Sequence, residues 1–282
     1  MRLIHITPGG GLGNQMFQYM FARSLQLRVP GSIVAGYNMP LWNLVRPYSD
    51  HLPKNTLRVR GDGSIHLIDL NKLVSFLNES DDRAIDLYAL AMRLEYYPPH
   101  DFVSSLFQPD RLNNAPIFGP EYLVINVRGA EILGDFHVDY MPTPIFFLRE
   151  LVFSTGLSPV FVGQLGNDTY SQKIRHVFPE ARFLPSTSVA VDFEIIRRAS
   201  NLVISVSSFS WLGGWLSNAK TIHMPLLGLL NPLQRPDVDL IPRGDKRYRI
   251  YEFPVRKWHA TEEDLDYILN DHGPYPVTSA AL

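Results

Sequence analysis

The 282-residue sequence contains no cysteine and no long apolar run. Without cysteine there is no disulfide framework, no thiolate zinc site and no thiol nucleophile, and a reducing compartment is favoured. A membrane-spanning helix needs about 18 or more consecutive apolar residues. The apolar N-terminal stretch breaks at Pro8, before the core of a signal peptide would be complete. We therefore expect a cytoplasmic protein with at most peripheral membrane contact.

The sequence also lacks an excess of charge of either sign. Its 26 Lys and Arg residues are balanced by 28 Asp and Glu residues, which gives a formal net charge of -2. A nearly neutral chain creates no field that attracts nucleic acid or an anionic membrane. We expect no nucleic-acid partner, and any bound phosphate must be held by local side chains and backbone amides.

The first half of the chain opens with a strand–helix–strand pattern. The predicted elements are a strand at 2–7, a helix at 14–28, a second strand at 32–37, an irregular polar segment at 41–63, and helices at 68–77 and 83–94. Prolines then interrupt residues 97–120, which indicates a boundary there. We expect two domains, at 1–115 and 116–282.

The second half alternates short apolar strands with helices. Strands are predicted at 122–127, 160–163, 182–184, 202–206 and 221–224, and helices near 143–155, 168–178, 189–200 and from Trp211. Short continuous apolar strands joined by helices indicate a parallel sheet with both faces covered. The predicted fold class is α/β, with two facing Rossmann-like domains. Ligands of such sheets bind over the carboxyl ends of the strands.

The stretch PGGGLGNQMFQY, residues 8–19, is a glycine-rich turn between the first strand and the first helix. A dinucleotide-binding loop would have a third glycine where Asn14 stands and an acidic residue after the next strand, and neither is present. No Gly-Lys-Ser/Thr follows, which excludes a Walker loop. Two readings stay open: a structural turn with nothing bound, or a turn whose Asn14 and Gln15 cap the helix and offer donors to a ligand.

Two stretches of the sequence resemble a known enzyme family. GGGLGNQMFQYMFARSL, residues 9–25, resembles the N-terminal motif of the bacterial α-1,2-fucosyltransferases. SVSSFSWLGGWLSNAKTI, residues 205–222, is similar to that family's SSFSWWGAWL signature. The resemblance implies an inverting glycosyltransferase of the twin-Rossmann (GT-B) type that moves fucose from GDP-fucose, in α-1,2 linkage, onto a hydroxyl of a glycan acceptor.

A third motif of that family, His-x-Arg-Arg-Gly-Asp, is altered in this sequence. The matching stretch is NVRGAE, in which Asn126 replaces the histidine, Gly129 the second arginine and Ala130 the glycine. Arg128 and Glu131 keep the first arginine and an acid. The family's acidic SDD is also absent, because FVGQLGND stands at 161–168. Guanine recognition and the identity of the sugar are therefore left open.

Departure of a nucleoside diphosphate requires positive charge or amide donors at its oxygens. We recognise no Asp-x-Asp cation motif, so we expect no metal and no cofactor, with the GDP-sugar as donor substrate. Arg128 can contact a diphosphate with two donors, and the helix near Trp211 offers backbone N–H groups. The predicted donor-binding residues are Gly11, Gly13, Asn14, Gln15, Arg128, Ser207, Ser208, Phe209 and Ser210. The predicted catalytic residues are Arg128, Glu131 and Asn14.

Inverting transfer also uses a base that deprotonates the acceptor hydroxyl. The loop GAEILGDFHVDY, residues 129–140, contains four candidates: Glu131, Asp135, His137 and Asp139. The sequence favours none of them. Asn14 and Gln15 could orient the acceptor hydroxyl or the donor sugar from the first domain.

Each candidate residue has a purely structural alternative. Arg128 could pair with Glu131, the serines could cap a helix, and Trp211 and Trp215 have the spacing of helix-to-sheet packing. The alternative functions are the same scaffold with another nucleotide sugar, and a degenerate, non-catalytic protein that binds glycan or nucleotide. The expected partners are a nucleotide sugar and a glycan acceptor. The acceptor's identity and the oligomeric state are left open.

Overall fold

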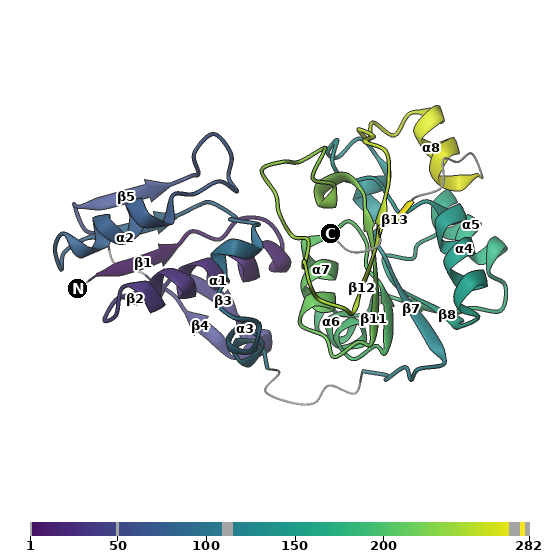
Figure 1. Ribbon diagram of the computed structural model, residues 1–282, viewed down its shortest axis with the longest axis horizontal. Coiled ribbons are helices and arrows are strands. Elements are labelled where there is room, and N and C mark those ends of the chain that lie inside the picture. Colours follow the sequence, from purple (N-terminus) through teal and green to yellow (C-terminus); the bar gives the residue numbers. More distant parts are fainter. Residues whose placement is uncertain (1, 49–50, 109–114, 271–276, 280–282) are drawn as a thin grey trace. The chain divides into compact units, whose positions relative to one another are not determined.

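A computed structural model describes residues 2–48, 51–108, 115–270 and 277–279 of the chain (Figure 1). The chain divides into two compact units. The first unit comprises Met1–Leu112 and Asp237–Leu240, and the second comprises Asn113–Pro236 and Ile241–Leu282. Among the described residues, no helix combines the length and the apolar character that crossing a membrane requires.

The first unit is built on a parallel sheet with the strand order β2-β1-β6-β5. The strands are β1 (Leu3–Ile6), β2 (Ile33–Ala35), β5 (Thr56–Val59) and β6 (Ala84–Leu87). The other elements are α1 (Leu12–Arg28), the hairpin of β3 (Tyr37–Met39) and β4 (Leu44–Arg46), α2 (Leu70–Asn78), α3 (His100–Leu106), and the short 3-10 helices η1 (Pro40–Trp42) and η2 (Leu94–Tyr96).

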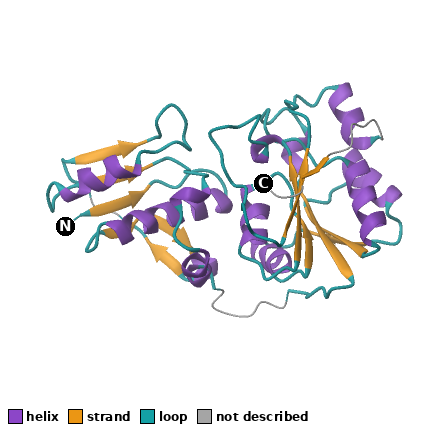
Figure 2. Cartoon of the chain, viewed as in Figure 1, coloured by secondary structure: helices purple, strands orange, loops and turns teal. Residues whose placement is uncertain are grey.

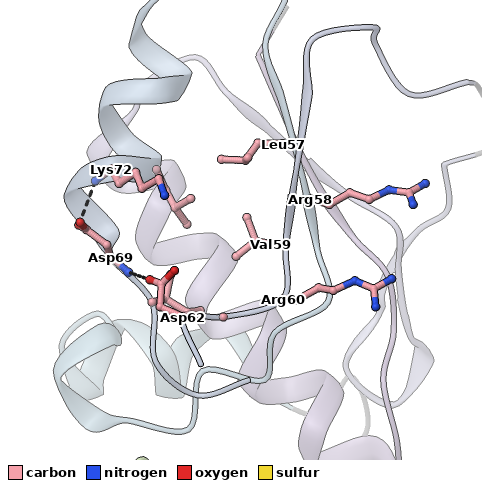
Figure 3. A pocket seen from close by; sticks show the side chains of 10 residues that line it. Leu57, Arg58, Val59, Arg60, Asp62, Asp69 and Lys72 are labelled. Atoms are coloured by element: carbon pink, nitrogen blue, oxygen red, sulfur yellow. Dashed lines mark hydrogen bonds between the residues drawn. The ribbon is translucent and has the colours of Figure 1, made fainter. Parts of the chain in front are cut away.

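The two long helices of the first unit lie on the same face of its sheet. The connections from β1 to β2 and from β5 to β6 step along the sheet in the same direction, so right-handed crossovers place α1 and α2 together, and the two helices contact each other. On β5, Leu57 and Val59 point toward α2, whereas Arg58 and the following Arg60 point the opposite way (Figure 3). Side chains therefore alternate between an apolar face under the helices and a second face.

The second face of this sheet is covered in part by a connecting segment. Leu3, Ala35 and Ala84 form a buried cluster on it, and Tyr48 and Leu52 pack against that cluster. No described helix takes this position. We call it the open face of the first sheet.

The second unit contains a larger sheet with the strand order β13-β12-β11-β10-β7-β8-β9, parallel except for β13. The strands are β7 (Tyr122–Val127), β8 (Ser158–Gly163), β9 (Arg182–Pro185), β10 (Asn201–Val203), β11 (Thr221–Leu226), β12 (Tyr248–Glu252) and β13 (Val277–Ser279). The 3-10 helices of this unit are η3 (Ala130–Leu133) and η4 (Gly228–Leu230).

Helices cover both faces of the second sheet. The helices are α4 (Ile145–Thr155), α5 (Thr169–Val177), α6 (Val189–Arg197), α7 (Ser208–Trp215) and α8 (Glu262–Leu269). Helices α6 and α7 lie on one face, and α4, α5 and α8 lie on the other (Figures 1 and 2). The central strand β7 is accordingly buried along almost its whole length. The predicted α/β class, with a parallel sheet in each half, is confirmed.

Two sequence-based predictions about the first half are wrong. Residues 83–94 were expected to be a helix, but they contain β6, a central strand of the sheet. The segment 41–63, expected to be irregular, contains β4 and β5. The four residues of β6 are all buried, including Asp86. Burial against both neighbouring strands overrides the helical spacing of this segment's apolar residues.

The second sheet also contains a buried histidine. His223 on β11 is only 5% exposed, and its Nδ1 lies 2.7 Å from the Tyr251 hydroxyl. Burial, with a smaller contribution from the charge of Arg249, lowers the pKa of His223 to about 4. The fold therefore holds this imidazole neutral at physiological pH.

We predict that His223 makes the protein less stable in acid. An unfolded histidine has a pKa near 6.5, so between about pH 6.5 and 4 the unfolded chain binds more protons than the folded one, and stability falls as the pH falls. The loss from this residue is up to about 3 kcal/mol. Urea denaturation across this pH range should show a shallower decline in the free energy of unfolding for His223→Gln than for the wild type. Equal declines would contradict the prediction.

Candidate functional site

The carboxyl ends of three adjacent strands of the second sheet gather most of the predicted site residues. The strands β10, β7 and β8 are neighbours in that order. Arg128 follows β7, Gln164 follows β8, and the segment Ser205–Ser207 follows β10. Because parallel strands end at the same edge of a sheet, these side chains lie together where ligands of such sheets bind.

Asn126, the residue that replaces the family's histidine, ties these three strands together. It is 9% exposed. Its Nδ2 donates to the Val162 carbonyl at 3.2 Å, and its Oδ1 accepts from the Ser205 hydroxyl at 2.7 Å. An amide does this with one donor and one acceptor, and both are satisfied. Asn126 therefore fixes the floor of the site and does not point into it as a free group.

Arg128 and Glu131 form an ion pair, in which Arg128 Nη2 donates to Glu131 Oε1. Arg128 Nε is buried and lacks a hydrogen-bond partner among the described residues. Gln164 connects the other strand: its Nε2 donates to Glu131 Oε2 at 3.3 Å, and its Oε1 accepts from the Gly129 N–H at 3.0 Å. The guanidinium is thus oriented by a carboxylate and still has unused donor capacity.

A second guanidinium lies near Arg128. Burial raises the pKa of Tyr140, and the charges of Arg128 and Arg235 oppose this rise. Both guanidinium groups therefore act on this half-buried phenol. Each is also paired with a carboxylate, Arg128 with Glu131 and Arg235 with Asp139.

The serines after β10 have separate roles. Ser207 is the N-cap of α7, and its hydroxyl accepts from the N–H groups of Phe209 at 3.2 Å and Ser210 at 3.4 Å. Ser210 is fully buried, and its hydroxyl accepts from the Ser205 N–H at 3.0 Å. Ser207 and Ser210 thus shape the turn, whereas Ser208 and Phe209 are partly exposed at the start of the helix. The tryptophans Trp211 and Trp215 stack on each other inside the core.

Two of the four base candidates are polar neighbours in one network. Asp139 is 6% exposed, and its carboxylate accepts from Arg235 at 2.9 Å and from Gln234 at 2.8 Å. His137 is exposed, but its Nδ1 accepts from the Asp139 N–H at 3.1 Å. A neutral imidazole that accepts at Nδ1 carries its proton on Nε2. The outward nitrogen of His137 is then a donor.

The two remaining base candidates are also paired. Glu131 is held by Arg128 and Gln164, as described above. Asp135 is exposed and lies 3.7 Å from Nδ1 of His259. All four predicted residues lie in the second unit, in the segment that follows β7.

The glycine turn of the first unit corrects one expectation about Asn14. The N-cap of α1 is Gly11, and no side chain caps this helix. Asn14 lies within the first helical turn and folds back over Gly10, which has φ of +66°; a Cβ there would be 2.4 Å from Asn14 Nδ2. The left-handed backbone at this position favours glycine. Gln15 Nε2 donates to the Gly10 carbonyl at 3.3 Å.

Gln18, which the sequence did not single out, fastens this turn. Its side chain is fully buried. Its Oε1 accepts from the Gly9 N–H at 3.0 Å, and its Nε2 donates to the carbonyls of Thr7 at 3.0 Å and Tyr88 at 3.2 Å. An amide within the otherwise apolar stretch MFQYMF was the available signal. Gln164 was also missed, and only its place after a predicted strand could have indicated it.

The premise that the sequence lacks an Asp-x-Asp motif is wrong, because two such sequences occur, away from the candidate residues. In Asp264-Leu265-Asp266, Asp264 forms a capping box with Thr261 at the start of α8. Asp237-Val238-Asp239 belongs to the first unit, where the Leu94 N–H donates to the Asp239 carbonyl at 2.8 Å. Within the described parts of the chain, no group of three or more His, Asp or Glu residues could hold a metal ion.

Comparison with solved structures finds glycosyltransferases. The chain is similar to E. coli heptosyltransferase WaaC with ADP, at 13% identity and a TM-score of 0.47 over 90% of this chain and 94% of that one. It is also similar to a glycosyl transferase family 9 structure from Veillonella parvula, at 11% identity and a TM-score of 0.43 over 89% and 86% of the two chains. The dodecameric iron-containing glycosyltransferase TibC from enterotoxigenic E. coli gives 12% identity and a TM-score of 0.42 over 83% and 59%.

No protein-family model matches the sequence, and no curated protein matches it. The structural similarities are low, and by themselves they assign this chain neither a donor nor an acceptor.

We predict that Gln18→Leu destabilises the first unit by about 2–3 kcal/mol, because a buried N–H and two buried carbonyls lose their partner while the side-chain volume is kept. Gln26→Leu on the same helix is the matched control, since Gln26 is partly exposed and makes one such bond, to the Ser32 carbonyl at 2.8 Å. Thermal unfolding followed by circular dichroism measures both. Equal, small effects would show that the turn does not depend on Gln18.

Proposed function

We propose that the chain is an inverting glycosyltransferase that moves a sugar from a nucleoside diphosphate to a hydroxyl of a glycan, with GDP-fucose as donor and an α-1,2 linkage as product. In this proposal the second unit binds the donor and the first unit binds the acceptor. Arg128 contacts the diphosphate, Asn14 positions the reacting sugar or hydroxyl, and no metal takes part.

One observation carries the proposal: both family-like stretches form the same kind of turn. Residues 9–25 form the turn from β1 into α1, and residues 205–222 include the turn from β10 into α7. Each turn lies at the carboxyl end of a strand inside a parallel sheet. Ligands of open α/β sheets bind at these ends. Every strand-to-helix turn of a parallel sheet lies at this edge, so the support for the proposal is that the two family-like stretches both fall on such turns, one in each sheet.

The chemistry of the donor edge supports departure of a diphosphate. When the bond between the sugar and the phosphate breaks, the electron pair and negative charge leave with the diphosphate. Arg128 can neutralise that charge with its unused donors, and Glu131 holds the guanidinium in place. The start of α7 lies at the same edge, where the Phe209 and Ser210 N–H groups already donate to Ser207, so the helix contributes there mainly through the positive end of its dipole. Ser208 and Phe209, which are partly exposed there, are the residues of that turn best placed to meet a ligand.

The second candidate is the same scaffold with another nucleotide sugar, or a protein that binds nucleotide without transfer. It is favoured by Asn126, whose hydrogen-bonding groups are both used inside the fold. Isothermal titration with GDP, UDP, ADP and GDP-fucose in excess EDTA, followed by donor-hydrolysis and transfer assays, separates these functions. Preference for GDP with turnover supports the first proposal. Binding without any turnover supports a non-catalytic protein.

We predict that Arg128→Lys lowers kcat at least tenfold, because a lysine supplies a point charge without the two-donor geometry of a guanidinium. The matched control is Arg149→Lys on α4, an exposed arginine 3.6 Å from Glu150. It should keep wild-type kinetics. Steady-state transfer rates and melting temperatures of both variants make the comparison. Wild-type turnover in Arg128→Ala would end the assignment.

We predict that Asn14→Ala lowers the transfer rate much more than it weakens GDP binding. In this proposal GDP rests on the second unit, whereas Asn14 belongs to the first. A helix cap cannot explain such a result, because Gly11 holds that position. Titration with GDP, a transfer assay and a melting curve on this variant are sufficient. Normal transfer with a lower melting temperature would make the glycine turn a fold element only.

A further inference from the structure

The transfer proposed above requires a proton acceptor, and the second unit offers no uncommitted one among the four candidates. Asp139 and Glu131 are held by guanidinium groups, Asp135 faces His259, and His137 presents a donor outward. The inference that follows rests on the proposed function. It concerns the first unit, where a histidine and a buried carboxylate have not yet been given a role.

His5 and Asp86 form a pair on the open face of the first sheet. His5 lies on β1 and Asp86 at the opposing position on the neighbouring strand β6. His5 Nδ1 is 2.8 Å from Asp86 Oδ1, and the Thr7 hydroxyl donates to the same oxygen at 2.8 Å. Arg58 on β5 lies 3.7 Å from the other oxygen. Asp86 is only 2% exposed, while His5 is partly exposed.

This arrangement determines the tautomer of His5. An ionised carboxylate can only accept hydrogen bonds, so the proton shared with Asp86 belongs to Nδ1 of the imidazole. The neutral ring then has its lone pair on Nε2, and no hydrogen bond of the described residues occupies that atom. This is the reverse of His137, whose Nδ1 is the acceptor. A carboxylate that fixes Nδ1–H while Nε2 stays basic is the arrangement used in general-base catalysis.

The place of the pair in the fold fits a ligand. His5, Asp86 and Arg58 lie toward the carboxyl ends of their strands, and Thr7 leads directly into the glycine turn. Gln18 joins Thr7 to that turn. The open face carries no described helix, and His5 is partly exposed on it.

Tyr48 and Gly36 are the neighbours of the His5 ring on its two sides. The ring of Tyr48 is 5.5 Å from that of His5, measured between centroids. On the other side is Gly36, which has φ of +87°; a Cβ there would come within 2.8 Å of His5 Nε2. Among the described residues, the titratable and charged groups that face His5 are Asp86, Tyr48 and, through Asp86, Arg58.

A purely structural role explains these features less well. A carboxylate buried to 2% exposure in a sheet loses its hydration, and an apolar residue at this position would pack with no such cost. The neighbouring positions of this face, Leu3, Ala35 and Ala84, are apolar and already form a packed cluster. His5 and Asp86 lie next to this cluster, on the side of the carboxyl edge at which ligands of such sheets bind.

We propose that His5 is the proton acceptor of the reaction and that Asp86 is the residue that positions it. As the acceptor oxygen bonds to the anomeric carbon, its proton passes to His5 Nε2. The bond from that carbon to the phosphate oxygen breaks, and the electron pair leaves with the nucleoside diphosphate. Asp86 stabilises the imidazolium that results, and the ring later returns its proton to solvent. Water replaces the acceptor in donor hydrolysis.

The first test needs no acceptor and no variant. Nitrogen-15 NMR of the wild-type protein with labelled histidine, recorded at pH 8, distinguishes the two neutral tautomers of each imidazole. His5, assigned by the loss of its signals in His5→Gln, is expected to carry its proton on Nδ1. A proton on Nε2 would overturn the proposal, because that nitrogen could not then accept one.

The second test is kinetic, with GDP-fucose as donor and lactose or N-acetyllactosamine as acceptor. His5→Gln should lower kcat about 100-fold or more and leave the affinity for GDP within twofold, because a general base contributes about 10²–10⁴-fold. Asp86→Asn should also lower kcat, because an amide can donate to Nδ1 as well as accept from it and therefore no longer keeps the imidazole proton on Nδ1. In the wild type kcat/KM should fall on the acidic side as Nε2 becomes protonated, and His5→Gln should lose this limb.

The control is His100→Gln. His100 is an exposed histidine of the same unit, 3.4 Å from Asp101, and it should keep wild-type kinetics. Thermal unfolding of each variant separates loss of catalysis from loss of fold. If the wild type transfers sugar and folded His5→Gln transfers it equally well, the inference is wrong and the proposed function stands. If the wild type binds no nucleotide sugar and turns none over, the proposed function itself is wrong.

Discussion

The candidate donor site depends on one buried amide, that of Asn126. Its two hydrogen bonds, to the Val162 carbonyl and the Ser205 hydroxyl, join the end of β7 to the ends of β8 and β10. Buried polar groups must be paired, so this amide can be satisfied only when the three strand ends keep their present register. Arg128 follows two residues later and is positioned by the same strand. The carboxyl edge of the second sheet is therefore rigid before any ligand binds.

The first unit uses the same device at its own turn. Gln18, a fully buried amide, joins the Gly9 N–H to the carbonyls of Thr7 and Tyr88. In both units a side-chain amide holds the carboxyl edge of a parallel sheet, which is the edge at which ligands bind. The backbone N–H and C=O groups at the ends of the strands would otherwise need water as a partner. The glycine turn is thus a close-packed element of the fold, and its exposed surface is shaped by Gly11, Asn14 and Gln15.

Charge is arranged locally in this nearly neutral protein. In the second unit Arg128 and Arg235 lie near Tyr140, each with its own carboxylate, Glu131 and Asp139. A guanidinium held by a carboxylate keeps its orientation and can still contact an anion through its remaining donors. In the first unit the buried carboxylate of Asp86 faces a histidine instead. Anion binding and proton transfer would in this way belong to different sheets.

The sequence by itself determined the α/β class, β7 to β11 and α4 to α7 of the second half, and the two turns that carry the family-like stretches, because short apolar strands, helical spacing and glycine are local signals. It did not indicate β12 or α8. It did not determine β6, whose burial comes from β1 and β5 far away in the chain. The ion pair of Arg128 with Glu131 could be anticipated, because the two residues are three positions apart in the sequence. Asp139 pairs with Arg235, 96 residues away, and His5 pairs with Asp86, 81 residues away. Only the tertiary structure decided these pairs. Distant strands come together, and carboxylates lose their hydration and need a partner, only when the sheets form.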